Sequence, residues 1–247
     1  MMVAMVSLPL PLSRRAFALL LLLILVSGAG CGLLPSVTET PPGALTFTTY
    51  IELGMPEQDA FIGGDSAAPD PVSRISVPDA YVPQILSRPI FALARPARHD
   101  PLKLRRDPFG PFPRGRLLPV TVQGWLGARG RGSYSVDGAT ARLEAAFSSL
   151  IPNSVYSLWC ARHTYASDVT VERACDATNA AASFTTDAAG AATVRLTLSP
   201  LAPSTEETGT LIELIYHSDG RARAPSESEP GVTTHIQLFA DLLPSKR

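Results

Sequence analysis

Residues 192–198 read Ala-Thr-Val-Arg-Leu-Thr-Leu, and this stretch decides the fold class. Its apolar side chains recur at every second position, whereas Thr193, Arg195 and Thr197 fill the positions between them. A period of two is typical of a β-strand that buries one face and exposes the other. The stretch therefore predicts a half-buried strand in a sheet with one solvated side.

Similar β-rich runs recur through the second half of the chain, with turn residues between them. We predict strands at 117–126, 139–148, 154–161, 181–186, 191–198, 210–217 and 233–242, with short extra strands at 133–136 and 169–173. The run 211–216 (LIELIY) is apolar almost throughout and is expected to be a central strand, and 187–190 (DAAG) is expected to be a tight turn. In the last run, Ile236, Leu238 and Ala240 are expected to share one face.

No long helical periodicity interrupts these runs. Seven or eight short strands in residues 117–247 predict an all-β fold, an antiparallel two-sheet sandwich of immunoglobulin-like or jelly-roll type. A segment of that length can bury a core of its own.

The segment before this domain is rich in proline. Residues 32–119 hold 15 of the 23 prolines, and proline removes a backbone donor and resists sheet interiors. We therefore expect 31–116 to be an extended linker or arm with one strand, at 44–53. Six basic residues between 98 and 116 suit either a solvated linker or contact with an anionic surface. Phe109 and Phe112 are candidates to pack this segment against the domain.

The composition excludes several classes of protein. The chain has 247 residues, 21 basic and 22 acidic side chains, and a net charge of −1, whereas a nucleic-acid-binding protein usually has a basic excess. With 45% hydrophobic and 17% charged residues, it is too apolar to be wholly disordered. Three cysteines are too few for a small disulfide scaffold, and the odd number implies that one has a separate role.

The amino terminus has the pattern of an export signal. Arg14 and Arg15 precede an uncharged apolar run, which ends in small residues before Cys31. A charged region, an apolar region and a small-residue zone predict a secretory signal over 1–30. The alternative is an uncleaved single-span anchor, although the run is shorter than the roughly 20 residues that cross a bilayer.

Residues 28–31 (GAGC) resemble a bacterial lipobox, apart from Gly28 where leucine is usual. The resemblance implies that Cys31 is the lipidated first residue of the mature chain and that the protein is an extracytoplasmic, membrane-anchored lipoprotein of the cell surface or periplasm. An ordinary signal peptide with an incidental cysteine is the alternative. Residues 13–17 (SRRAF) also resemble the twin-arginine export motif, which leaves two export routes open.

Two segments of the predicted sandwich carry a further resemblance. Residues 150–159 (LIPNSVYSLW) and 184–190 (FTTDAAG) resemble a pattern in secreted bacterial β-sandwich modules, found in extracytoplasmic domains of anti-sigma factors and in lipoproteins. The resemblance implies a fold rather than an activity. Only 15 residues precede Ala16, so a cytoplasmic anti-sigma domain is not expected.

Cys160 and Cys175 remain once Cys31 is assigned to export. Fourteen residues separate them, and in an oxidising compartment we expect a disulfide worth about 3 kcal/mol on the chain-entropy model. The alternative is a metal thiolate with His163 as a neighbour. A blue-copper site is excluded because all four methionines lie at or before Met55.

The histidines suggest a metal site. His217 ends one predicted strand and His235 begins the next, so a hairpin would bring them together. With His163 and Asp219 they would form a ligand set suited to zinc or copper. The alternative is that each is an ordinary polar residue at a strand end.

Catalytic motifs are not found. The sequence has no Gly-x-Ser-x-Gly elbow and no phosphate loop, so it does not predict an enzyme. His217, Ser218 and Asp219 are adjacent, and adjacent strand residues point to opposite faces, so they are not expected to form a triad. The aromatic residues Trp125, Tyr134, Tyr156 and Trp159 suit either an exposed binding platform or the core. The core is expected above all for Trp159, whereas both alternatives stay open for Trp125, which lies between Gly124 and Gly127.

The leading hypothesis is a lipid-anchored extracytoplasmic β-sandwich that acts as a binding or structural module of the bacterial cell envelope. Its partners would be the membrane, through the lipid on Cys31, and an envelope protein or polymer. The competing hypothesis is a metal-binding envelope protein that uses zinc or copper at His163, His217, His235 and Asp219, including a redox-active form.

Overall fold

The computed structural model describes residues 43–52, 57–63, 71–76, 78–96, 112–167, 169–176 and 182–242. The predicted signal segment 1–30, Cys31 and most of the basic stretch 98–116 lie outside the described residues. Phe109 lies outside them too, whereas Phe112 is described and packs edge to face on Phe61, with ring centroids 5.5 Å apart.

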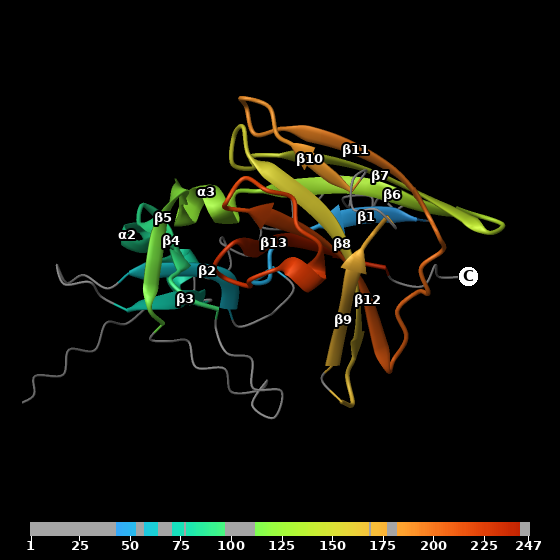
Figure 1. Ribbon diagram of the computed structural model, residues 1–247, viewed down its shortest axis with the longest axis horizontal. Coiled ribbons are helices and arrows are strands. Elements are labelled where there is room, and N and C mark those ends of the chain that lie inside the picture. Colours follow the sequence, from blue (N-terminus) through green and yellow to red (C-terminus); the bar gives the residue numbers. More distant parts are fainter. Residues whose placement is uncertain are drawn as a thin grey trace, which may run out of the picture. The chain divides into compact units, whose positions relative to one another are not determined.

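The described strands form three antiparallel sheets (Figure 1). Sheet A has the order β1 (Ala44–Phe47), β6 (Arg129–Asp137), β7 (Thr140–Ser148), β11 (Ala192–Leu198). Sheet B has the order β10 (Ser183–Thr185), β8 (Val155–Thr164), β12 (Thr208–His217), β13 (Thr234–Asp241), with β9 (Val169–Ala174) also on β8. Sheet C has the order β3 (Val72–Ser76), β2 (Glu57–Gly63), β4 (Pro89–Leu93), β5 (Arg114–Thr121). The predicted all-β class is confirmed.

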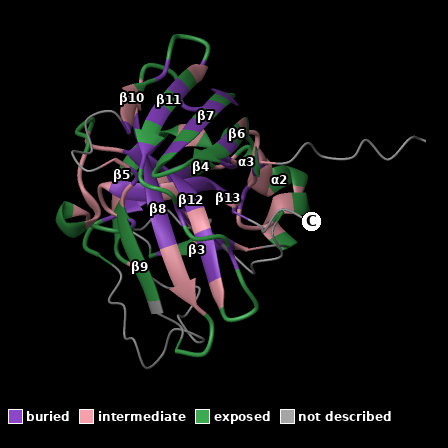
Figure 2. Ribbon diagram, turned by 90° about the vertical axis from the view of Figure 1, so that its right-hand side faces the viewer, coloured by how far each residue is buried: buried purple, intermediate pink, exposed green. Residues whose placement is uncertain are grey.

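Sheets A and B enclose the main core of the sandwich. Along β7 and β11 buried and exposed residues alternate, as the period of two predicts. Their inward side chains, such as Leu143 and Leu196, join one hydrophobic cluster with Leu158 of β8 and Leu214 of β12. The predicted central strand is confirmed, because β12 lies between β8 and β13. Figure 2 shows the same division, with β9 exposed and much of β8 and β12 buried.

A backbone bridge between described residues joins sheets A and B at one corner. Thr48, just after β1, donates its N–H to the carbonyl of Phe239 in β13 at 3.0 Å, and Phe239 donates back to Thr48 at 2.9 Å. The chain therefore passes from sheet A to the edge of sheet B without a break in hydrogen bonding.

The expectation of an extended arm over 31–116 is wrong for its described part, which contributes β1 to sheet A and three strands to sheet C. The prolines sit where a sheet tolerates them. Pro89 is the first residue of β4, and Pro119 lies in β5, which is an edge strand. Two more begin short helices, Pro78 in η1 (Pro78–Tyr81) and Pro83 in α2 (Pro83–Leu86).

The strand predicted at 117–126 ends early. β5 stops at Thr121, whose hydroxyl accepts the Gly124 N–H at 3.3 Å and caps the helix α3 (Val122–Leu126). This helix buries Trp125 completely. The β-forming composition of the segment was therefore overridden by the cap and by the burial of the indole.

The alternation predicted for 233–242 is wrong at one position. Leu214 pairs with Leu238 but Ile215 pairs with Ile236, so Gln237 is an extra residue in β13. This bulge puts Ile236 and Leu238 on opposite faces of sheet B. The side chain of Gln237 accepts the Tyr156 hydroxyl at 2.8 Å and donates to the Trp125 carbonyl at 3.1 Å.

The turn predicted at 187–190 is confirmed. Gly190 has φ +72°, and the Asp187 carboxylate accepts the N–H groups of Ala189 and Ala191, both at 2.8 Å. The turn joins β10 to β11 and so carries the chain from sheet B to sheet A.

Candidate functional site

The predicted disulfide is present. Cys160 lies in β8 and Cys175 just after β9, with their Cα atoms 4.9 Å apart. Both are buried, and both belong to the main hydrophobic cluster. The Cys175 N–H also donates to the Leu158 carbonyl at 3.3 Å. The disulfide and this hydrogen bond together fasten the end of β9 to the centre of β8.

His217 and His235 lie on paired strands but point to opposite faces of sheet B. His235 is the register partner of Tyr216, so it shares a face with Tyr216 and not with the next residue, His217. The ring contacts agree with this placement: His217 packs near Trp159, and His235 near Trp125 and Tyr216. The hairpin expected from the sequence exists, but its register does not bring the two imidazoles to one side.

His163 and Asp219 do not join them either. His217 pairs with Val155, whereas His163 lies eight residues further along β8, which corresponds to roughly 26 Å of extended strand. His163 contacts the hydroxyl of Thr170 at 2.9 Å, and Asp219 holds Arg223 at 2.7 Å. Within the described ranges, no group of three or more His, Cys, Asp or Glu side chains is placed to hold a metal ion. The predicted ligand set is therefore not assembled.

Each of the two central histidines has a serine partner instead. Nε2 of His217 lies 2.7 Å from the hydroxyl of Ser157, and Nε2 of His235 lies 3.1 Å from that of Ser218. Ser218 thus bonds to His235 and not to its neighbour His217, as the alternation of strand residues predicts. Burial lowers the pKa of His217 to about 4, although the charge of Asp219 opposes the shift. Burial also lowers the pKa of His235.

The contact between Ser157 and His217 was not foreseen from the sequence. Sixty residues separate them, and they meet because β8 pairs with β12 in a register that puts both on one face. A serine and a histidine at hydrogen-bond distance are the first two members of a hydrolytic triad. Here Ser157 is fully buried and His217 is 1% exposed, so no substrate reaches the pair. We interpret the contact as a structural hydrogen bond inside the fold.

Asp219 is charged and held by arginine. Burial acts to raise its pKa, but hydrogen bonds from the Arg223 side chain and the Arg221 N–H outweigh burial and lower it. An aspartate bound in this way stabilises the loop after β12 rather than serving as a metal ligand.

A buried carboxyl lies on the face of sheet B that turns away from sheet A. Glu213 pairs with Trp159 across β12 and β8, and both side chains are buried. Burial raises the pKa of Glu213 well above its ordinary value, and the nearby charges of Glu172 and Asp59 add to the shift. This carboxyl was not singled out from the sequence, because a single acidic residue in an apolar run gives no signal of its surroundings.

The aromatic side chains do not form an exposed platform. Trp125 and Tyr156 are fully buried, Trp159 is 3% exposed and Tyr134 is 9% exposed. The hydroxyl of Tyr134 accepts the Leu201 N–H at 2.6 Å. The prediction that Trp159 belongs to the interior is confirmed, and the alternative left open for Trp125 is decided in favour of burial.

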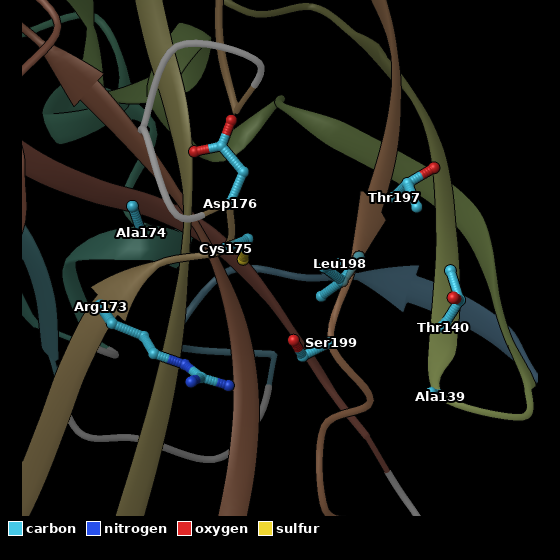
Figure 3. Close-up of a pocket in the computed structure, with 9 residues that line it drawn as sticks. All are labelled: Ala139, Thr140, Arg173, Ala174, Cys175, Asp176, Thr197, Leu198 and Ser199. Carbon is cyan, nitrogen blue, oxygen red and sulfur yellow. The ribbon is translucent and has the colours of Figure 1, made fainter.

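An open pocket of about 520 Å³ lies beside the disulfide, where the end of β9 meets the ends of β7 and β11 (Figure 3). Its lining combines one cation, one carboxylate, three hydroxyl groups and a small apolar surface. The residues are Ala139, Thr140, Arg173, Ala174, Cys175, Asp176, Thr197, Leu198 and Ser199. The volume falls within the range of small-molecule sites.

None of the helices in the described part of the chain has the length and hydrophobicity needed to cross a membrane. Comparison of the chain with protein-family models, with curated proteins and with solved structures found no match.

Proposed function

We propose that the protein is a lipid-anchored extracytoplasmic protein of the bacterial cell envelope, and that its β-sandwich acts as a binding module there. The observation that carries this proposal is the division of the three cysteines. Cys160 and Cys175 are bonded to each other and buried, whereas Cys31 follows the small residues that end the apolar run. Stable structural disulfides form in oxidising compartments, outside the cytoplasm.

Cys31 supplies the anchor in this proposal. Its sequence context resembles a lipobox, and each buried methylene of an attached acyl chain contributes about 0.8 kcal/mol of membrane affinity. Several chains on one cysteine therefore hold a protein firmly at a membrane. The folded residues would then lie outside the cell or in the periplasm, tethered to the bilayer at one end.

A binding role fits the described residues better than a catalytic or metal-dependent one. The pair that resembles part of a triad, Ser157 and His217, is closed to substrate. The four residues predicted as metal ligands are spread over two faces and two ends of sheet B. The pocket beside the disulfide is an accessible feature of the described residues, and its lining has varied chemistry.

The anchor is tested by a Cys31→Ser variant expressed in a bacterial host with lipoprotein processing. We expect the wild-type protein to incorporate labelled fatty acid and to partition with membranes, and the variant to lose both properties. A Cys160→Ser, Cys175→Ser double variant is the control, because it keeps Cys31 and should still be labelled. Membrane retention and labelling that survive Cys31→Ser would refute the proposal.

A further inference from the structure

The pocket beside the disulfide is lined by an arginine, Arg173, that forms no ion pair with a described residue. Arg173 is exposed in β9, and its guanidinium has no hydrogen bond or ion pair with any described residue. Neighbouring arginines differ. Arg162 donates to Thr208 and Thr210, and Arg195 lies 3.5 Å from Glu144. Arg173 therefore lines the pocket with guanidinium donors that no described residue engages.

Three hydroxyl groups share this pocket with Arg173. Thr140, Thr197 and Ser199 are exposed, and their hydroxyls have no hydrogen-bond partner among the described residues. Each hydroxyl can donate one hydrogen bond and accept two. Figure 3 shows Thr140 and Thr197 on one side of the pocket and Arg173 on the other, with Ser199 between them.

An apolar surface completes the lining. Ala174, Cys175 and Leu198 also line the pocket, and Cys175 is fixed there by its bond to Cys160. The disulfide thus fastens the end of β9, next to Arg173, to β8 within sheet B. A site that is rigid before it binds loses less conformational entropy when a ligand arrives.

We propose that this pocket binds an acidic saccharide, a sugar unit that carries a carboxylate beside its hydroxyl groups. The inference rests on the proposed role as an envelope binding module and names the ligand class of that module. The planar guanidinium of Arg173 matches a carboxylate with two parallel hydrogen bonds. The hydroxyls of Thr140, Thr197 and Ser199 match those of a sugar, and Leu198 offers a surface for its C–H groups.

Asp176 favours a carboxylate over a phosphate. It lies at the edge of the pocket and accepts the Ala182 N–H at 3.1 Å. Its negative charge repels a doubly charged phosphate group more strongly than a singly charged carboxylate.

The test is calorimetric titration of the full chain in detergent with two matched tetrasaccharides. One alternates glucuronic acid with N-acetylglucosamine, and the other contains N-acetylglucosamine alone. We expect binding of the acidic sugar, which weakens as salt is added, and binding of the neutral sugar that is at least about tenfold weaker.

Substitutions in the lining test whether the acidic sugar binds in the pocket. Arg173→Gln should weaken binding of the acidic tetrasaccharide by about tenfold or more, and Thr197→Val by several-fold. Arg131→Gln is the matched control, because Arg131 is also an exposed arginine on a strand but lies outside the pocket lining. It should bind as the wild type does. Circular dichroism checks that each variant is folded.

Three results would overturn the inference: equal affinity for the two sugars, no binding of the acidic sugar at millimolar concentration, or tighter binding of inorganic phosphate. These results are independent of the membrane anchor. Absence of binding with Cys31-dependent membrane retention intact refutes the ligand class alone. Binding that persists while Cys31→Ser leaves the protein on the membrane refutes the anchor alone.

Discussion

Glu213 of β12 lies directly opposite Trp159 of β8, and each buries a polar atom that no described residue satisfies. Glu213 is 4% exposed with Oε2 unpaired, and Trp159 is 3% exposed with Nε1 unpaired. A buried carboxylate is costly without a partner, so the folded state favours the neutral carboxylic acid. The protonation of Glu213 therefore makes the stability of sheet B depend on pH.

Replacing Glu213 by glutamine should remove part of that dependence. In the wild type, the unfolded chain releases the Glu213 proton above its ordinary pKa of 4.5, whereas the folded chain retains it. Stability is therefore complete below pH 4.5 and falls as the pH rises, by at most about 1.4 kcal/mol per pH unit. Glu213→Gln keeps the shape without the charge and should be more stable than the wild type at pH 8, as measured by urea unfolding.

Glu206→Gln provides the control for this experiment. Glu206 is exposed in the loop before β12, so its replacement should leave the pH dependence unchanged. If Glu213→Gln and the wild type lose stability in parallel between pH 5 and pH 8, Glu213 does not bury a proton as described.

His217 should make the protein less stable as the pH falls, whereas Glu213 makes it less stable as the pH rises. Its pKa is lowered to about 4 in the fold, so between pH 6.5 and 4 the unfolded chain binds a proton that the folded chain does not. Stability should therefore fall by about 3 kcal/mol as the pH drops through this window. NMR titration of the imidazole gives the pKa directly, and unfolding at pH 4, 5, 6 and 7 gives the stability.

His217→Gln can still bond to Ser157 but does not titrate, so it should lose less stability in acid than the wild type. The lowered pKa of His235 leaves a residual acid dependence in the variant. A midpoint near 6.5 in the titration of His217 would show that burial does not govern this imidazole.

The sequence was sufficient to predict those strands and turns that are determined by residues close together in the chain. Alternation along β7 and β11, the apolar run of β12 and the Asp187–Gly190 turn all depend on neighbouring residues, and all were predicted. The bonded pair Cys160 and Cys175 was predicted from the number of cysteines and from the expectation of an oxidising compartment. The burial of Trp159 was also correct, although it lies on the face of sheet B away from the main cluster.

Features that depend on register or on edge position were not predictable. Proline density in the first half suggested an arm, because the sequence does not show that Pro119 lies in an edge strand. Two histidines in a hairpin suggested convergence, yet a shift of one residue sends them to opposite faces. The contact between Ser157 and His217 arises from the pairing of β8 with β12, which local patterns do not specify.

Loss of the disulfide should destabilise the sandwich. Reduction, or the variant Cys160→Ala with Cys175→Ala, frees a loop of 15 residues in sequence separation and should cost about 3 kcal/mol. Guanidinium unfolding with and without reductant measures the difference. The double alanine variant should show no further effect of reductant, and equal stability of the oxidised and reduced wild type would contradict the prediction.

Removal of metal ions with a chelator should leave the thermal stability of the protein unchanged. The opposite faces of His217 and His235, and the distance of His163 along β8, leave no shared point for a metal ion. We expect the same melting temperature before and after dialysis against EDTA, and the same temperature for His163→Ala. Zinc or copper at one ion per chain, lost together with stability on changing His217, would restore the metal hypothesis.

Two glycines with positive φ should differ sharply in their response to alanine. Gly190 has φ +72° and Gly138 has φ +58°, so each substitution pays the backbone penalty of the left-handed region, about 1–2 kcal/mol. A Cβ at Gly190 would also collide with the carbonyl oxygen of Leu150, whereas a Cβ at Gly138 meets nothing within 4 Å. Gly190→Ala should therefore lose clearly more than the roughly 1–2 kcal/mol expected for Gly138→Ala in urea unfolding. Equal losses at the two positions would mean that the Asp187–Gly190 turn can move away from Leu150 without further cost.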